Sequence, residues 1–243
     1  MDIDFPLILV IAVLVTGVAW GMHKFGKATG KYVEFGGSFF PVLLLVLVLR
    51  SFLFEPFKIP SGSMIPTLNV GDFILVNKYS YGLRLPVLGT KVVEVGEPQR
   101  GDVMVFIPPH KDQYYIKRVI GVPGDKIDIR DGVLYVNDEM MEQTPHPLWA
   151  SPDPSYTVQM EQLNGVEHAI RRQVNPGRYS VNYSTVVKPE HYLMIGDNRD
   201  DSYDSRAWGQ VHESMIVGKA VAVWMHWDKF FSLPSFGEAR LIE

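Results

Sequence analysis

The stretch IPSGSMIPT, residues 59–67, separates the last long apolar run of the chain from the polar part that follows. Its prolines, Pro60 and Pro66, fix the backbone torsion φ and lack the N–H group that a helix or a central strand requires. Gly62 lets the backbone turn sharply and approach another molecule closely. The sequence therefore predicts a rigid, exposed loop that presents two serines, although an ordinary turn has the same composition.

The composition limits the classes of protein to which the chain can belong. Its 243 residues are 47% hydrophobic, which is high for a protein that never meets lipid. The formal net charge is −4 and no helix-turn-helix or zinc-finger pattern occurs, so we expect no nucleic-acid partner. The chain has no cysteine, which excludes disulfides, thiol nucleophiles and cysteine-ligated zinc. Covalent catalysis would therefore use serine, threonine, lysine or a carboxylate.

Two apolar runs near the N-terminus predict two membrane-spanning helices, with the lipid bilayer as a partner. Residues 1–22 contain a short N-terminus and an uncharged apolar run long enough to cross a bilayer. Residues 23–34 form a basic loop, and residues 35–54 form the second span. Because lysines favour the cytoplasmic side of a membrane, we expect this loop in the cytoplasm and residues 55–243 on the outer face.

After the second apolar run, the sequence changes to short runs of β type that are separated by turn signals. This pattern predicts a mainly β protein, in which an all-β domain follows the two helices. Five prolines between residues 142 and 176 interrupt the pattern, so we expect an irregular insertion there. The expected strands cover residues 72–76, 102–106, 114–120, 126–129, 133–136, 192–195 and 217–225.

Lys117 lies in the middle of one expected strand, between apolar neighbours. Alternation along a strand puts Tyr115, Lys117 and Val119 on one face, with Ile116 and Arg118 on the other. A strand lysine is ordinarily solvated. A buried lysine, in contrast, loses basicity, and its neutral amine can accept the proton of a serine hydroxyl. The sequence therefore allows a catalytic pair of a serine and a lysine.

The polar segment at residues 196–206 lies between two expected strands and is dense in charges and hydroxyl groups. One interpretation is a solvated loop. As a functional element, the segment would pair Asp204 with Arg206 and present the Ser202 hydroxyl to orient a catalytic group.

Other catalytic patterns do not occur in the sequence. No HExxH, GxSxG or SxxK motif is present, and the seven histidines are scattered along the chain. A catalytic metal needs three or four clustered ligands. We therefore expect no metal and no cofactor.

Several blocks of sequence follow one another after the first apolar run. They are RSF at 50–52, PSGSMIPTL at 60–68, RGDV at 100–103, YIKR at 115–118, GD at 124–125, GDNR at 196–199 and SR at 205–206. Together they resemble the bacterial type I signal peptidases, which are membrane-anchored serine proteases, over nearly the whole chain. The SGSM loop alone also resembles self-cleaving proteases of the repressor type. The lysine, in place of a histidine, argues against the eukaryotic and archaeal branch.

The resemblance implies a role for each polar residue named above. Ser63 would be the nucleophile, Lys117 its general base, and Ser61 would form the oxyanion hole together with the Ser63 N–H. The supporting residues would be Ser202, which orients the lysine, and the ion pair of Asp204 and Arg206.

The resemblance also implies a substrate groove, in part lined by Phe57, Ile59, Pro60, Met64, Leu68, Ile74, Val105, Tyr115 and Ile116. Tyr114 departs from the pattern, because relatives often carry an acidic residue there. The insertion at residues 142–176 is shorter than in some relatives and lacks their cysteines.

The function that the resemblance implies is the removal of signal peptides from exported preproteins by a serine endopeptidase. It would act at the outer face of the bacterial cytoplasmic membrane, on substrates with small residues at positions −1 and −3. One alternative is a membrane-anchored extracytoplasmic β-domain that binds partners without catalysis. A second is a protease that cleaves only itself, but such proteins usually carry a DNA-binding module where this chain has two apolar runs.

Overall fold

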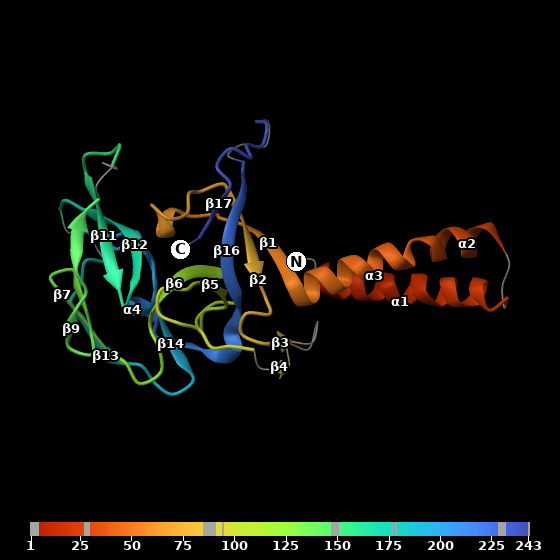
Figure 1. Cartoon of the computed structure of the whole chain (residues 1–243), viewed down its shortest axis with the longest axis horizontal. Coiled ribbons are helices and arrows are strands. Elements are labelled where there is room, and N and C mark those ends of the chain that lie inside the picture. The colour runs from red at the N-terminus through yellow and green to blue at the C-terminus, as the bar shows by residue number, and fades with distance from the viewer. Residues whose placement is uncertain are drawn as a thin grey trace.

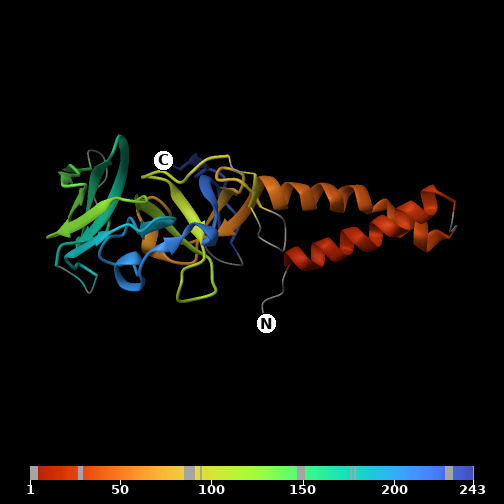
Figure 2. The same ribbon diagram turned by 90° about the horizontal axis from the view of Figure 1, so that it is seen from below.

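The computed structural model describes residues 5–26, 30–84, 91–93, 95–146, 151–175, 177, 179–227 and 232–242. A long pair of helices projects from a body of β-strands (Figure 1). A second view shows the helices lying beside each other, with the β body at one end (Figure 2). The expected architecture, mainly β with two apolar N-terminal helices, is confirmed.

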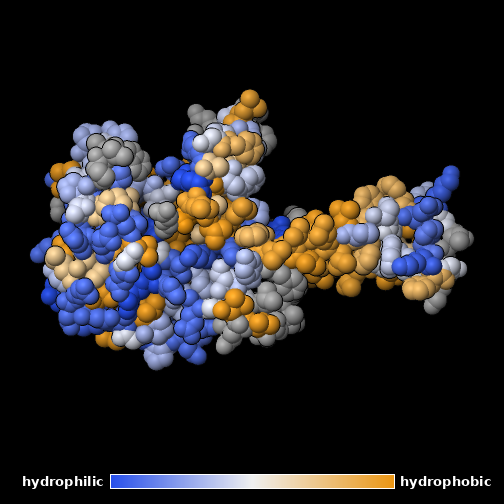
Figure 3. Space-filling view, viewed as in Figure 1, coloured by the Kyte–Doolittle hydropathy of each residue, from blue (hydrophilic) through white to orange (hydrophobic). Residues whose placement is uncertain are grey.

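The helical pair consists of α1 at Phe5–Lys24 and a returning arm formed by α2 at Lys31–Ser38 and α3 at Phe40–Val48. The two arms pack closely because glycine stands at the crossing: a Cβ atom on Gly37 would lie 2.8 Å from the Trp20 Cα. On the face shown in Figure 3, most of the described surface of the pair is hydrophobic.

Each arm of the pair is long and apolar enough to cross a membrane, judged by length and composition. The qualifying windows are Leu7–Lys24 and Lys31–Val48, with mean hydropathy of 1.8 and 1.6. An apolar helix whose side chains have no protein to pack against is stable in a hydrocarbon environment. The helices are therefore suited to anchor the β body at a bilayer.

The bounds of these helices differ from the expected ones. Helices α1 and α2 extend into the expected loop at residues 23–34, to Lys24 from one side and from Lys31 on the other. Within the expected second span at residues 35–54, α3 ends at Val48, a π-helical turn covers Leu49–Leu53, and β1 begins at Phe54. Long charged side chains are good helix formers, so hydropathy does not mark where such a helix begins.

The main sheet has eight strands in the order β1–β2–β16–β5–β6–β14–β15, with β17 paired to β16, and its pairs are antiparallel. The strands are β1 at Phe54–Lys58, β2 at Asp72–Asn77, β5 at Val103–Phe106, β6 at Tyr115–Gly121, β14 at His191–Ile195, β15 at Val211–His212, β16 at Ile216–His226 and β17 at Arg240–Leu241. The strands expected in this part of the chain are confirmed to within two residues at either end. Their apolar residues alternate or run continuously, as half-buried and fully buried strands require.

A second sheet, in the order β13–β7–β8–β9, contains the expected hairpin at residues 126–136. Its strands are β7 at Lys126–Arg130, β8 at Val133–Val136, β9 at Glu139–Met140 and β13 at Tyr183–Val186. A short pair, β3 at Leu83–Arg84 and β4 at Lys91–Val93, lies outside both sheets.

The prediction of an irregular insertion at residues 142–176 is wrong. This region forms a third sheet from β10 at Gln143–Pro145, β11 at Tyr156–Leu163 and β12 at Val166–Gln173. The turn between β11 and β12 has positive φ at both Asn164 and Gly165, as a tight hairpin requires. The prolines at 152 and 154 precede β11 and Pro145 ends an edge strand, where a missing N–H costs little. Residues 147–150 and 176 lie outside the described residues.

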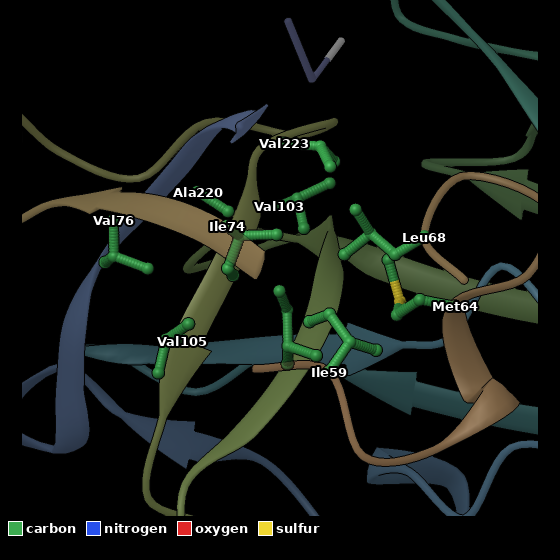
Figure 4. Close-up of a cluster of buried hydrophobic side chains, with 10 residues drawn as sticks. Ile59, Met64, Leu68, Ile74, Val76, Val103, Val105, Ala220 and Val223 are labelled. Atoms are coloured by element: carbon green, nitrogen blue, oxygen red, sulfur yellow. The ribbon is translucent and has the colours of Figure 1, made fainter. Parts of the chain in front are cut away.

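Three clusters of buried apolar side chains fill the β body, and β6 contributes to all of them. Ile116 belongs to the cluster in Figure 4, Ile120 to the second and Val119 to the third. Strand β6 is thus apolar on both faces and is surrounded by packed side chains. Any polar residue of this strand, including Lys117, is removed from water as a consequence.

Candidate active site

The serine-bearing loop is a 3₁₀ turn at Gly62–Met64 whose position is fixed at both ends. Met64 is fully buried in the cluster of Figure 4 and anchors the turn from below. On the other side, the Asn198 N–H donates to the Ser63 carbonyl oxygen over 3.1 Å, and the Asn198 side chain donates to the Gly62 carbonyl over 2.9 Å. Ser63 is 9% exposed and Met64 is fully buried, so the expected exposure of the loop holds only for its edge at Pro60 and Ser61.

The Lys117 amine lies against the Ser63 hydroxyl, and the two side chains form a hydrogen bond. Lys117 is 4% exposed and therefore lies in the core rather than on a solvated face. Burial lowers the pKa of Lys117 from 10.5 to about 8, because the charged ammonium loses its hydration. Asp204 and Asp197 raise this pKa, and Arg206 lowers it. A large fraction of the amine is therefore neutral at mildly alkaline pH.

Ser61 lies next to the nucleophile candidate. Its Oγ is 3.5 Å from the Ser63 Oγ, and its extended backbone places the two hydroxyls on the same side of the loop. A hydroxyl in this position can donate a hydrogen bond to an oxygen that develops negative charge beside Ser63.

Ser202 is brought to the same place from the segment at residues 196–206. A Cβ atom on Gly196 would lie 2.3 Å from the Ser202 Oγ and 2.4 Å from the Ser63 carbonyl oxygen, so both serines converge on this glycine. The Ser202 Oγ is buried and has no hydrogen-bond partner in the described part of the chain. A buried hydroxyl without a partner is costly, so its presence needs an explanation, such as a catalytic role. Its orienting role toward Lys117 stays a prediction.

Asp204 and Arg206 form the expected ion pair, with 2.8 Å between Arg206 Nη2 and Asp204 Oδ2. Asp204 also accepts from the Gly196 N–H over 3.1 Å and caps the short helix α4 at Ser205–Trp208. Arg206 reaches back to donate to the Arg199 carbonyl oxygen over 2.6 Å. The pair therefore closes the segment into a compact loop that holds Ser202 in place.

A second buried ion pair, between Arg118 and Asp197, was not expected from the sequence. The guanidinium donates to both carboxylate oxygens, over 3.0 and 2.8 Å, and both residues are fully buried. Burial alone would raise the pKa of Asp197, but the charge and hydrogen bonds of Arg118 hold it below its usual range. Thr67, four residues after Ser63, donates to the same carboxylate over 2.5 Å. The only sequence signal for this ion pair was the presence of a second charged residue, Arg118, which follows Lys117 and lies on the other face of an otherwise apolar strand.

An open cleft of about 500 Å³ lies over Ser63 and Lys117. Of the predicted groove residues, Pro60, Tyr115 and Ile116 line it, and Phe57 contacts the lining residue Tyr114 edge to face at 5.2 Å. The remaining predicted residues do not line the cleft but lie buried in the core cluster beneath the loop. These are Ile59, Met64, Leu68, Ile74 and Val105, none more than 2% exposed. The cleft is completed by Ser61, Gly62, Gln113, Asn198, Asp201 and Tyr203.

One group of metal-ligand type occurs among the described residues: Asp72, His226 and Glu238. Asp72 accepts hydrogen bonds from the His226 ring over 2.7 Å and from the Arg240 guanidinium over 3.0 Å. A carboxylate that is already paired with a cation is a poor metal ligand. This group therefore links the C-terminal segment to β2.

A serine hydroxyl in contact with a buried amine of lowered pKa is the arrangement of a hydrolase that uses lysine as its base. Comparison with known sequences agrees with this class. The chain belongs to the family described as signal peptidase, peptidase S26, which matches residues 32–227.

Curated relatives match over the full length. The chain is 46% identical to signal peptidase I of Pseudomonas fluorescens and 44% identical to that of Pseudomonas aeruginosa, with all of each chain covered. It is 36% identical to signal peptidase I of Buchnera aphidicola from Schizaphis graminum, over 79% of this chain and 74% of the relative.

The convergence on Gly196 leads to a first prediction. Gly196→Ala should lower the peptidase kcat by about 100-fold or more, because a Cβ atom would displace Ser63 or Ser202, and shifts of about 1 Å cost that much. The measurement is kcat of the purified variant, with circular dichroism to confirm folding. Gly237→Ala is the matched control, since its nearest neighbour would be 3.8 Å away. A near-wild-type kcat for Gly196→Ala would contradict the close approach of the two serines.

Proposed function

We propose that this protein is a serine endopeptidase that removes signal peptides from exported preproteins by means of Ser63 and Lys117. The observation that carries the proposal is the buried Lys117 amine on the Ser63 hydroxyl, in a chain of the signal peptidase family. Signal peptides are the substrates that the name of the relatives indicates.

In the proposed reaction, the neutral Lys117 amine takes the proton of the Ser63 hydroxyl as the oxygen attacks the scissile carbonyl. The Ser63 N–H and the Ser61 hydroxyl donate to the oxyanion that forms. The resulting Lys117 ammonium then protonates the leaving amine, and the mature chain departs. Water subsequently hydrolyses the ester on Ser63 with the same amine as base. Each step uses groups that the geometry brings together around one hydroxyl.

The strand edges beside Ser63 support binding of an extended peptide. In the described part of the chain β14 pairs with β6 only from Arg118 onward, which leaves the edge at Tyr115–Lys117 open on that side. An extended substrate can add to such an edge through main-chain hydrogen bonds, with alternate side chains in pockets. Because Ile59 and Met64 fill the space beneath the loop, those pockets would be shallow. We therefore propose small residues at substrate positions −1 and −3.

The two apolar helices support a location at the bacterial cytoplasmic membrane, with both helices spanning it. Lys24 and Lys31 lie at the turn of the helical pair, and basic residues favour the cytoplasmic side. The β body at the other end of the pair would then lie on the outer face, where preproteins emerge.

A membrane-anchored β-domain that only binds partners is the competing function. It would have no need for a buried lysine amine, which costs free energy without an evident gain in binding. The convergence of Ser61, Ser63, Lys117 and Ser202 therefore favours catalysis.

The decisive experiment incubates detergent-solubilised protein with an exported preprotein. The wild type should release the mature chain, and Ser63→Ala, which lacks the nucleophile, should not. A preprotein with Phe in place of Ala at −1 should be cleaved at least about tenfold more slowly, because an extra methylene in a shallow pocket already costs about 1–3 kcal/mol. Cleavage by Ser63→Ala at the wild-type rate would refute the proposed nucleophile.

The pH dependence tests the base. Since the pKa of Lys117 is lowered to about 8, the amine is mostly protonated and inactive at lower pH. We expect kcat/KM to rise roughly tenfold per pH unit up to that value and then to level off. Lys117→Arg should be inactive because a guanidinium stays charged, whereas Ser202→Ala should retain slow turnover. Appreciable turnover by Lys117→Arg would exclude Lys117 as the base.

The orientation can be tested by proteolysis of membranes. Protease added to the outer face should degrade the β body and spare the loop between the helices. If the β body is cut only in inverted vesicles, the proposed orientation is reversed. The control is a cytoplasmic membrane protein of known topology in the same preparation.

A further inference from the structure

The cleft over Ser63 carries a single exposed charge, the carboxylate of Asp201. Of the residues that line the cleft, Lys117 and Asp201 are the acidic or basic ones, and Lys117 is buried. The other lining groups are apolar, aromatic, hydroxyl or amide. A substrate that fills the cleft therefore meets one fixed negative charge at its surface.

Asp201 is held in one orientation by the hairpin of β11 and β12. The Tyr156 hydroxyl donates to one carboxylate oxygen over 2.6 Å, and the Gln173 side chain donates to the other over 2.9 Å. The hydrogen bond to Asp201 raises the pKa of Tyr156, as expected for a phenol that donates to a carboxylate. Both oxygens of this surface carboxylate are thus engaged by neutral donors, which limits the mobility of the side chain.

The nearby cation of Arg171 forms no ion pair with this carboxylate. The Arg171 guanidinium lies 3.8 Å from the centre of the Tyr156 ring, and its Nε donates to the Asn198 side chain over 3.3 Å. Arg171 is thus engaged with an aromatic face and an amide, and forms no ion pair with Asp201. The carboxylate remains available to a cationic group of a ligand.

The position of Asp201 relative to Lys117 identifies which part of a substrate it meets. A base that returns its proton to the leaving amine must have the leaving segment on its own side of the nucleophile. Asp201 and Tyr203 flank Ser202, whose hydroxyl converges with Ser63 on Gly196. The Tyr203 ring contacts the His110 ring, with 5.4 Å between their centroids. The His110 ring in turn contacts the ring of Tyr115, two residues before Lys117, with 5.7 Å between their centroids. Asp201 therefore belongs to the segment that borders the cleft next to Lys117, and Asp197 and Asp204 of this segment lie close enough to the amine to raise its pKa.

We infer that Asp201 is a specificity-determining residue for the first residues of the mature chain, where it favours a basic side chain and disfavours an acidic one. The inference rests on the proposed function. It assigns a role to the hairpin of β11 and β12, which supplies the two groups that position the carboxylate. An exposed ion pair changes a binding constant by roughly 1.5- to 5-fold, so the preference for Lys over Glu should be about three- to tenfold.

The experiment compares peptide substrates that have Ala at −3 and −1 and differ only in Lys, Gln or Glu at position +1 or +2. For the wild type, kcat/KM should fall in the order Lys, Gln, Glu at one of these positions at least, and the difference should shrink in high salt. In Asp201→Asn the three substrates should be cleaved at equal rates. Tyr156→Phe, which removes one hydrogen bond to the carboxylate, should show a smaller preference than the wild type.

Glu139→Gln is the matched control, because it removes an exposed negative charge from a different sheet and should leave the preference intact. If the wild type cleaves all peptides but shows no charge preference, or if Asp201→Asn keeps it, the inference is wrong while the proposed function stands. If the wild type cleaves none of the peptides and no preprotein, the proposed function itself fails.

Discussion

The site depends on keeping one amine out of water. The lowering of the Lys117 pKa from 10.5 to about 8 corresponds to a net of roughly 3 kcal/mol against the charged form, and burial is its largest cause. This free energy comes from the packing of β6, which carries apolar residues of three separate clusters on either side of the lysine. The core therefore has a chemical consequence as well as a structural one: it sets the fraction of amine able to take a proton.

Two carboxylates, Asp204 and Asp197, lie close enough to Lys117 to raise its pKa against the effect of burial. Each of these carboxylates has its own guanidinium: Asp197 is paired with Arg118, and Asp204 with Arg206. Arg206 lowers the Lys117 pKa and so offsets part of the effect of the carboxylates, and the desolvation effect prevails. The Asp204–Arg206 pair thus limits the negative charge around the proposed base, in addition to fixing the loop that carries Ser202. Buried ion pairs add little net stability, so a role of this kind is a physical reason for their presence.

Much of the fold could be predicted from the sequence, because strands of the main sheet show their periodicity locally. The strand of Lys117 was recognisable for the same reason, and the Ser63 loop was recognisable from its prolines and Gly62. The hairpin of β11 and β12 was missed, since prolines near a strand were interpreted as prolines within an irregular segment. The Arg118–Asp197 pair was also missed: its partners are 79 residues apart, and no local pattern reports a contact across that distance. Several predicted groove residues proved to be buried for a related reason. The sequence pattern of apolar residues is the same whether their side chains face a cleft or the core.

The missed hairpin is also the element that braces the catalytic segment. Strand β12 extends its pairing to this segment: the Arg171 N–H donates to the Asp197 carbonyl over 2.8 Å, and the Arg199 N–H donates to the Arg171 carbonyl over 2.9 Å. Arg199 is buried and paired with Glu161 of β11, in contact with His168.

Asn198, which lies between Asp197 and Arg199, donates hydrogen bonds to the carbonyl oxygens of Ser63 and Gly62. A continuous chain of hydrogen bonds therefore runs from the hairpin through Asn198 to the nucleophile loop. In such a chain the rigidity of the hairpin fixes the position of Ser63 relative to Lys117. The hairpin, although it contributes no group to the proposed reaction, thereby limits how far Ser63 can move from Lys117, and the proposed proton transfer over a single hydrogen bond requires that limit.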